Sequence, residues 1–155
     1  MLFNEKHVLA HMHHANIARV FHIFIDSERV GGKDQRVLIT MEKLDMDLQD
    51  YIEKTYEYKP PLGEILPEAD AKRYFTHVAR ALDYLQTTHS VCHRDIKAAN
   101  ILIEARTLTA KLTDFGLARV VPKNADGSVK PVFWREAVRE YKSPEMWRPP
   151  HMINW

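Results

Sequence analysis

The sequence predicts an α+β fold, because its helical and strand-like segments are grouped rather than regularly alternating. Residues 17–25 and 36–42 are rich in branched and aromatic side chains, which is typical of strands. Residues 68–87 carry apolar side chains at helical spacing, and the short apolar segments 100–104 and 110–115 follow. With two further helices described below, the expected order is helix, two strands, two helices, two strands and a loop.

The first helix is expected over residues 1–12, and the second over residues 46–54. The pair Gly31-Gly32 predicts a turn between the two strands. Pro67 suits the first turn of the helix over 68–87. The apolar stripe of that helix is predicted to consist of Ala71, Phe75, Val78, Leu82 and Leu85. After Gly116 the periodicity is lost, and we expect a long loop.

Composition excludes several function classes. The chain has 155 residues, enough for one domain, and its 22 Lys and Arg nearly balance 21 Asp and Glu. Bulk charge therefore predicts neither a nucleic-acid nor a membrane partner. Cys92 is the only cysteine, so no internal disulfide can form, and no apolar segment approaches the length of a membrane span. We expect an intracellular protein of the cytoplasm or nucleus.

The segment "VCHRDIKAANILIE" and the later "KLTDFGLAR" carry the chemistry. Asp95 can accept a proton from a hydroxyl, and Lys97 can offer a cation to a phosphoryl group. Asn100 and Asp114 offer the hard oxygen ligands that Mg²⁺ accepts. Taken singly, each of these residues is more often a turn or cap residue. The ordered combination of "HRDIKAAN", "DFG" and "SPE" is specific, and it indicates phosphoryl transfer from a Mg-nucleotide.

These motifs resemble those of the eukaryotic protein kinases. The resemblance implies that Asp95 is the catalytic base, that Asn100 and Asp114 bind the metal, and that the cofactors are ATP and Mg²⁺. Lys97 at this position is the form found in serine/threonine kinases. The resemblance also implies an incomplete protein-kinase-like fold, a partial domain over 1–155. Residues 1–44 would be a remnant of the small lobe with the hinge, and 45–155 the start of the large lobe.

The segment "ITMEKLDMDL" resembles the last small-lobe strand and the hinge of that family. It implies that Met41 is the gatekeeper, that backbone groups of Glu42 and Leu44 face adenine, and that Asp47 lies near the ribose. Leu102 would lie beneath the adenine ring. The segment "NEKHVL" places Glu5 where the family has its ion-pairing glutamate. The resemblance further groups four residues as an apolar column between the lobes: Leu9, Val20, His93 and Phe115.

Regulation and partners are also implied by the resemblance. Arg94 before the catalytic aspartate goes with activation by phosphorylation of the following loop, in which Ser128 is the only hydroxyl candidate before Tyr141. The alternative for Ser128 is a plain solvated loop serine. The expected partners are a protein substrate and an activating subunit or upstream kinase. "DMDL" and "REYKSPE" are similar to the cyclin-dependent and mitogen-activated branches.

Three departures from the family pattern argue against phosphotransfer activity of this chain. The five glycines show no G-x-G-x-x-G spacing, no lysine precedes Glu5, and Val138 occupies a position where the family usually has threonine. A valine cannot donate the hydrogen bond that orients Asp95 and Lys97. We therefore expect the chain alone to have little or no phosphotransfer activity. We also expect it to be weakly folded, because the helix over 68–87 would normally bury its apolar stripe against helices that the 155 residues do not contain.

Other interpretations stay open. A pseudokinase or non-catalytic protein-binding fragment is the alternative function, and a small-molecule kinase fits less well because such enzymes rarely combine "DFG" with "SPE". His7 and His11 are four residues apart, which is also the spacing of a metal site on a helix. No H-E-x-x-H motif accompanies them, so the favoured interpretation is solvated histidines at a helix end.

Overall fold

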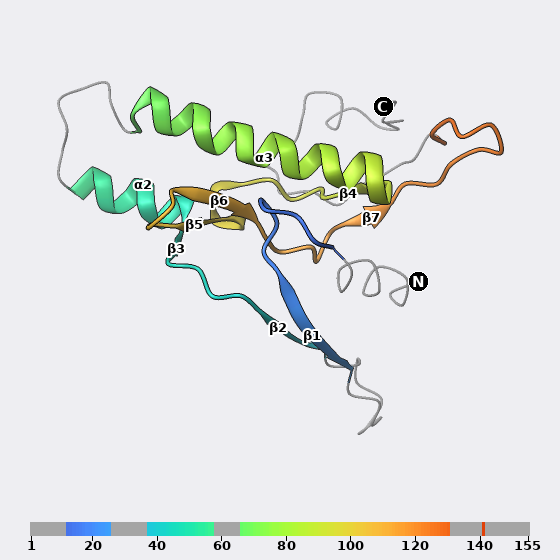
Figure 1. The fold of residues 1–155 in the computed structure, drawn as a ribbon, viewed down its shortest axis with the longest axis horizontal. Helices are drawn as coiled ribbons and strands as arrows, with labels where there is room; N and C mark the ends of the chain where they lie inside the picture. The colour runs from blue at the N-terminus through green and yellow to red at the C-terminus, as the bar shows by residue number, and fades with distance from the viewer. Residues whose placement is uncertain (1–11, 26–36, 58–65, 131–140, 142–155) are drawn as a thin grey trace.

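The computed structural model describes residues 12–25, 37–57, 66–130 and Tyr141 (Figure 1). Its elements are listed here in chain order: β1 (Val20–Ile25), β2 (Val37–Met41), β3 (Met46–Asp47), α2 (Leu48–Glu57), α3 (Glu68–His89), β4 (Val91–Cys92), the 3₁₀ helix η1 (Ala98–Asn100), β5 (Ile101–Glu104), β6 (Thr109–Leu112) and β7 (Arg119–Val120). The mixture of separate small sheets and helices confirms the α+β class. The domain division at residue 44 stays a prediction.

Three antiparallel sheets organise the described residues. The first pairs β1 with β2, with Ile23 opposite Ile39. The second has the order β3-β5-β6, and the third pairs β4 with β7. In Figure 1, α3 lies along one side of the β3-β5-β6 sheet, while the β1-β2 pair extends away from it. The loop between β4 and β5 therefore starts from the third sheet and ends in the second.

Local sequence explains both helices. The Asp47 Oδ1 accepts the N–H of Asp50 at 2.8 Å, so Asp47 caps the start of α2. Pro67 directly precedes α3, as expected for a residue without a backbone donor. The C-terminal cap of α3 is Ser90, which adopts a left-handed conformation (φ 53°) and donates its N–H to the Gln86 carbonyl at 3.1 Å.

The buried face of α3 differs from the predicted stripe. The buried residues of α3 are Tyr74, Val78, Ala81 and Leu85. Phe75 was predicted in the stripe but is 76% exposed, so that prediction was wrong. Apolar residues occupy adjacent helix positions, and the periodicity alone did not determine which of Tyr74 and Phe75 faces the sheet. Tyr74 does so, with its ring edge-on to that of Tyr51 at 6.3 Å.

The core lies between α3 and the β5-β6 hairpin. Leu85, Ala110 and Leu112 are fully buried, and Ile103 is nearly so. The segment 12–18 closes one side of this core, because Met12 and Ile17 join the same cluster of buried residues. Backbone hydrogen bonds fix the segment along β6: the Leu112 N–H donates to the Asn16 carbonyl at 2.8 Å, and the Ala18 N–H donates to the Leu112 carbonyl at 2.9 Å.

The strands predicted over 17–25, 36–42, 100–104 and 110–115 are confirmed as β1, β2, β5 and β6, and none of their ends differs from the prediction by more than three residues. The two-residue strands β3, β4 and β7 were not predicted, and β7 falls where a loop was expected. The helix predicted over 1–12 and the turn at Gly31-Gly32 lie outside the described residues, apart from Met12.

Leu85→Ala and Phe75→Ala test this orientation of α3. Truncating the fully buried Leu85 leaves a cavity and should lower the free energy of unfolding by about 2–5 kcal/mol. Truncating the exposed Phe75 should change it by less than about 0.5 kcal/mol. Urea unfolding followed by circular dichroism measures both. Equal losses for the two variants would contradict the orientation described here.

Candidate active site

The loop from His93 to Asn100 surrounds the carboxylate of Asp95. The Lys97 Nζ donates to Asp95 Oδ2 at 2.9 Å, and the Asn100 Nδ2 donates to the same oxygen and to the Asp95 backbone carbonyl, both at 2.8 Å. The loop ends in η1, where the Asn100 N–H donates to the Lys97 carbonyl at 3.0 Å. Three predicted site residues, Asp95, Lys97 and Asn100, are thus joined by direct hydrogen bonds.

The hydrogen bonds set the charge state of Asp95. The residue is only 7% exposed, and burial by itself would raise the pKa of its carboxyl group. The hydrogen bonds from Lys97 and Asn100 outweigh burial, and the pKa of Asp95 is lowered below its ordinary value. The same hydrogen bond raises the pKa of Lys97, with a smaller contribution from the negative charge of Asp114. Asp95 therefore stays an anion and Lys97 a cation at neutral pH.

Asp114 lies in the segment that follows β6. The Thr113 N–H donates to the Asn100 carbonyl at 3.0 Å, which ties this segment to the loop containing Asp95. His93 reinforces the connection, because its Nε2 lies 2.9 Å from the Thr113 carbonyl oxygen and its ring meets that of Phe115 edge-on at 4.8 Å. The ring contact joins two of the four residues predicted to form the apolar column between the lobes.

The backbone at Asp114 has a left-handed conformation (φ 57°), and its side chain is exposed. The Asp114 Oδ1 accepts the N–H of Gly116 at 3.2 Å. A Cβ atom at residue 116 would lie 3.2 Å from that same oxygen, which is closer than most Cβ contacts. Gly116 therefore leaves room for the carboxylate of Asp114.

The donor set fits a hard divalent cation. The Asn100 amide nitrogen makes both hydrogen bonds to Asp95, so its side-chain carbonyl oxygen remains as the acceptor. That neutral oxygen and the Asp114 carboxylate are of the kind Mg²⁺ prefers. Among the residues that the structure describes, no three His, Cys, Asp or Glu side chains cluster to hold a metal by themselves. Any metal here would take Asn100, nucleotide oxygens or water as further ligands.

The residues expected near the nucleotide lie on neighbouring elements. Met41 ends β2, and its Sδ lies 3.8 Å from the Thr113 Oγ1. In the β3-β5 register, Asp47 is directly opposite Leu102. The Asp47 carboxylate also caps α2, so one of its oxygens has a structural use that the sequence analysis did not anticipate. Leu44 lies between Met41 and Asp47 and is partly buried.

Glu42 makes an ion pair that the sequence analysis missed. Its carboxylate accepts two hydrogen bonds from the Lys111 Nζ, at 2.7 and 2.8 Å, and one from the Arg19 N–H at 2.7 Å. The Glu42 N–H donates to the Arg19 carbonyl at 2.9 Å. The Glu42–Lys111 ion pair therefore holds the segment that follows β2 against strand β6. The only hint in the sequence was a lysine within an apolar strand, which does not identify its partner.

Arg94 and Ser128 lie in different parts of the described structure. Arg94 has a left-handed backbone conformation (φ 70°), and its guanidinium donates to the Leu117 carbonyl at 3.1 Å. Ser128 lies in an exposed turn, where its hydroxyl donates to Asp126 Oδ1 at 2.6 Å and accepts from Asn124 Nδ2 at 2.8 Å. The described residues do not include Glu5, His7, Leu9, His11 or Val138, which were singled out in the sequence.

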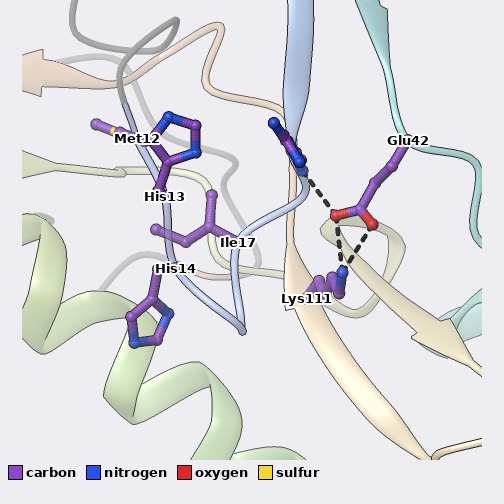
Figure 2. A pocket seen from close by; sticks show the side chains of 7 residues that line it. Met12, His13, His14, Ile17, Glu42 and Lys111 are labelled. Carbon is purple, nitrogen blue, oxygen red and sulfur yellow. Dashed lines mark hydrogen bonds and ion pairs between the residues drawn. The ribbon is translucent and has the colours of Figure 1, made fainter.

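A cavity of about 260 Å³ lies next to the Glu42–Lys111 ion pair (Figure 2). Its lining residues are Met12, His13, His14, Ile17, Arg19, Glu42 and Lys111. Figure 2 shows the Glu42–Lys111 pair on one side of it and the segment 12–17 on the other. Of the residues predicted to act on a nucleotide, only Glu42 lines it. The cavity is therefore distinct from the surroundings of Asp95.

An ionised aspartate beside a lysine, with oxygen-bearing side chains nearby, is a combination suited to phosphoryl transfer. The family model described as the protein kinase domain matches residues 1–153, so the chain belongs to the protein kinase family. Members of this family generally use ATP with Mg²⁺. No helix in the described part of the chain has the length and apolar character needed to cross a membrane.

Two curated relatives of the chain are named as a cyclin-dependent kinase and a mitogen-activated protein kinase. The chain is 38% identical over 114 residues to the cyclin-dependent kinase 4 homolog of Caenorhabditis elegans, covering 74% of the chain and 25% of that protein. It is 31% identical over 147 residues to mitogen-activated protein kinase 8 of Oryza sativa subsp. japonica, covering 94% of the chain and 23% of that protein. The chain thus spans about a quarter of the length of these relatives.

A double-mutant cycle on Glu42 and Lys111 tests whether their ion pair stabilises the folded chain. The side chains of this pair are 23% and 19% exposed, so Glu42→Gln and Lys111→Met should show a coupling energy of about 1 kcal/mol. The matched control is Glu68–Lys72 on α3, exposed by 80% and 75%, with an expected coupling of about 0.3–0.5 kcal/mol. Urea unfolding provides both values. If the coupling energy of Glu42–Lys111 is no larger than that of Glu68–Lys72, the ion pair does not hold the segment after β2 against β6.

Proposed function

We propose that the chain carries the catalytic part of a serine/threonine protein kinase, which transfers the γ-phosphoryl group of ATP to protein hydroxyls. The observation that carries the proposal is the hydrogen-bonded group of Asp95, Lys97 and Asn100, to which Thr113 ties the segment containing Asp114. Lys97 supports serine or threonine as the acceptor, because tyrosine kinases usually have another residue near this position. Two of the curated relatives are named as a cyclin-dependent kinase and a mitogen-activated protein kinase.

In the proposed reaction, the substrate hydroxyl donates a hydrogen bond to Asp95 and passes its proton to that carboxylate as its oxygen attacks the γ-phosphorus. A new P–O bond forms to the substrate oxygen, and the bond between the γ-phosphorus and its bridging oxygen breaks, which releases ADP. Lys97 places positive charge beside the transferring group. The lowered pKa of Asp95 keeps its carboxylate ionised across the neutral range, so that it can accept the hydrogen bond of the substrate hydroxyl and orient it.

Asn100 and Asp114 are the residues that would hold Mg²⁺. When bound, the metal supplies positive charge that neutralises the phosphate oxygens of the nucleotide. The residues proposed to surround adenine and ribose are Met41, Glu42, Leu44, Asp47 and Leu102. The ion pair of Glu42 with Lys111 is compatible with this assignment, because it engages the side chain of Glu42, whereas the proposed contact with adenine uses the backbone. Glu5 is proposed to be the ion-pairing glutamate of the family, although no lysine precedes it in the 155 residues. The proposed domain division is 1–44 and 45–155.

Regulation would act through the loop after Gly116. The proposed partners are a protein substrate and an activating subunit or upstream kinase, in the cytoplasm or nucleus. Ser128 is the proposed phosphorylation site, with Arg94 as the receiving cation. Its hydroxyl donates to Asp126, so modification would replace a hydrogen bond with two neighbouring negative charges and rearrange this turn. No role for nucleic acid or membrane is proposed.

A non-catalytic binding role is the second candidate, and Val138 favours it. The threonine usual at this position would donate a hydrogen bond to the catalytic pair, and valine cannot. The 155 residues also contain no G-x-G-x-x-G segment to cover the phosphates. Losing one preorganised donor typically costs about 10²–10³ in rate, so we propose that the chain by itself transfers phosphate slowly at best.

Mg²⁺-dependent binding of ATP tests the proposal on the chain itself. We expect ATP with Mg²⁺ to raise the melting temperature more than ATP with EDTA, because a ligand that binds the folded state stabilises it. Asp114→Asn should abolish the Mg²⁺-dependent part of the shift. Asp126→Asn, an exposed aspartate in the Ser128 turn, is the matched control and should retain it.

Transfer of radiolabelled phosphate to serine- and tyrosine-containing peptides is measured on the same samples. Any transfer should favour serine and fall by about 10²–10⁴ in Asp95→Asn, while Mg²⁺-ATP binding persists. The metal assignment fails if the Asp114→Asn shift equals that of the unmodified chain. The non-catalytic role is supported instead if the chain binds Mg²⁺-ATP but transfers no phosphate to either peptide, and if Asp95→Asn binds Mg²⁺-ATP as the unmodified chain does.

A further inference from the structure

The cavity next to the Glu42–Lys111 ion pair lies apart from the residues that would transfer phosphate. Segment 12–17 forms one wall of it, and the ion pair forms the opposite wall (Figure 2). Its volume of about 260 Å³ is just below the roughly 300–1,000 Å³ of sites for drug-sized ligands. The cavity therefore has room for a compound of one or two rings.

Hydrogen bonds fix the wall that segment 12–17 forms. The Asn16 Nδ2 donates to the Ala110 carbonyl at 3.0 Å, and the Asn16 carbonyl accepts the Leu112 N–H at 2.8 Å. The Ala110 N–H in turn donates to the His77 Nδ1 on α3 at 3.1 Å. The wall is thus joined to β6, and β6 is joined to α3. A cavity with fixed walls binds a ligand without the cost of ordering them first.

The same wall offers uncharged and apolar side chains. Met12 and Ile17 line the cavity and belong to the buried core. His14 is a neutral imidazole, because its Nδ1 accepts the Asn16 N–H at 3.0 Å and an imidazolium nitrogen cannot accept. Its ring stacks on that of Tyr84 at 4.9 Å. This wall therefore suits the face of an uncharged ring.

The opposite wall presents a hydrogen-bond donor beside an acceptor. The Lys111 ammonium has three N–H groups, and its two hydrogen bonds to Glu42 leave one of them unused. The Glu42 Oε1 accepts from both Lys111 and the Arg19 N–H, whereas Oε2 accepts from Lys111 alone. Within the described ranges of the chain, no other group takes the third N–H or the remaining lone pair of Oε2. Both side chains line the cavity, so both groups are available to a ligand.

The charges around the cavity favour a neutral ligand. The charges of Glu42 and Lys111 offset each other at a distance of 2.7 Å. A ligand carboxylate on the Lys111 ammonium would lie close to the Glu42 carboxylate, and the two anions would repel each other. The guanidinium of Arg19 lies over the ring of Phe21, 5.6 Å from its centroid. A neutral group that carries an acceptor next to an N–H donor avoids this repulsion and matches both free positions of the ion pair.

We propose that this cavity binds an uncharged aromatic compound that carries a primary carboxamide. The amide oxygen would accept the free N–H of Lys111, and the amide N–H would donate to Glu42 Oε2. The ring would lie against Met12 and Ile17. Such a ligand would contact segment 12–17, β6 and the segment after β2 at once, and would stabilise their arrangement. Its binding does not depend on phosphoryl transfer.

Titration of the 155-residue chain with benzamide, followed by NMR of the methyl groups of Met, Ile and Leu, tests the proposal. The Met12 and Ile17 methyl signals should shift and saturate, with a Kd on the order of 1 mM for so small a compound. Acetophenone has nearly the same shape but no N–H donor, and benzoate has a second charged oxygen in place of the donor. Both compounds should bind at least about fivefold more weakly than benzamide.

Lys111→Met removes the proposed donor and keeps a long unbranched side chain, so it should weaken benzamide binding by at least about fivefold. Lys72→Met on α3 is the matched control, because the exposed Lys72 also pairs with a glutamate, Glu68. This control should bind benzamide as the unmodified chain does. Unchanged affinity in Lys111→Met overturns the proposal.

The comparison of the three compounds on the unmodified chain decides the question even if Lys111→Met folds poorly. Equal affinities for benzamide and acetophenone overturn the proposal, as does the absence of saturable shifts at Met12 and Ile17. Shifts confined to Leu44 and Leu102 would place benzamide among the residues proposed to surround the nucleotide, which also overturns it.

Discussion

The hydrogen bonds that Asp95 accepts are the interaction on which the rest of the site depends. A buried carboxylate is costly unless donors replace the water it has lost. Lys97 and Asn100 supply these donors from the five residues that follow, which folds the loop back on itself and ends it in η1. The requirement to keep one carboxylate ionised thus shapes the whole connection between β4 and β5.

The position of Asp114 follows from the same loop. The carbonyl of Asn100 accepts the N–H of Thr113, and His93 contacts both the Thr113 carbonyl and the ring of Phe115. The His93 ring is almost completely buried, and burial lowers its pKa, so it remains a neutral spacer between the two segments. The left-handed backbone at Asp114 stores some strain. That strain is tolerated because the residues on both sides are fixed.

Much of the fold and the composition of the site could be predicted from the sequence. The apolar side chains at helical spacing over 68–87 predicted α3, and the segments rich in branched and aromatic side chains predicted β1, β2, β5 and β6. Strands of two residues contain no periodicity, so β3, β4 and β7 left no signal. Phe75 was misplaced because Tyr74 beside it is also aromatic. The close association of Asp95, Lys97 and Asn100 followed from their spacing, since a loop of six residues keeps them near one another.

Contacts between distant segments could not be predicted in the same way. Glu42 and Lys111 are 69 residues apart, and the bond from Ala110 to His77 spans 33 residues. Their pairing depends on how β6 lies against α3 and the segment after β2, which no local pattern specifies. The histidines near residue 14 suggested only a weak metal site. Their actual contacts are with a tyrosine ring and a backbone amide, which need the tertiary structure to be seen.

Paramagnetic broadening by Mn²⁺ tests most directly the claim that Asn100 and Asp114 together bind one metal. Mn²⁺ accepts the same oxygen ligands as Mg²⁺, and with a non-hydrolysable ATP analogue it should broaden nearby amide resonances in the NMR spectrum of the chain. If Asn100 and Asp114 bind one metal, their amide signals should disappear first and together, while that of Gly127 in the Ser128 turn persists. Loss of signal near Asp126 with the signals of Asn100 and Asp114 retained would contradict it.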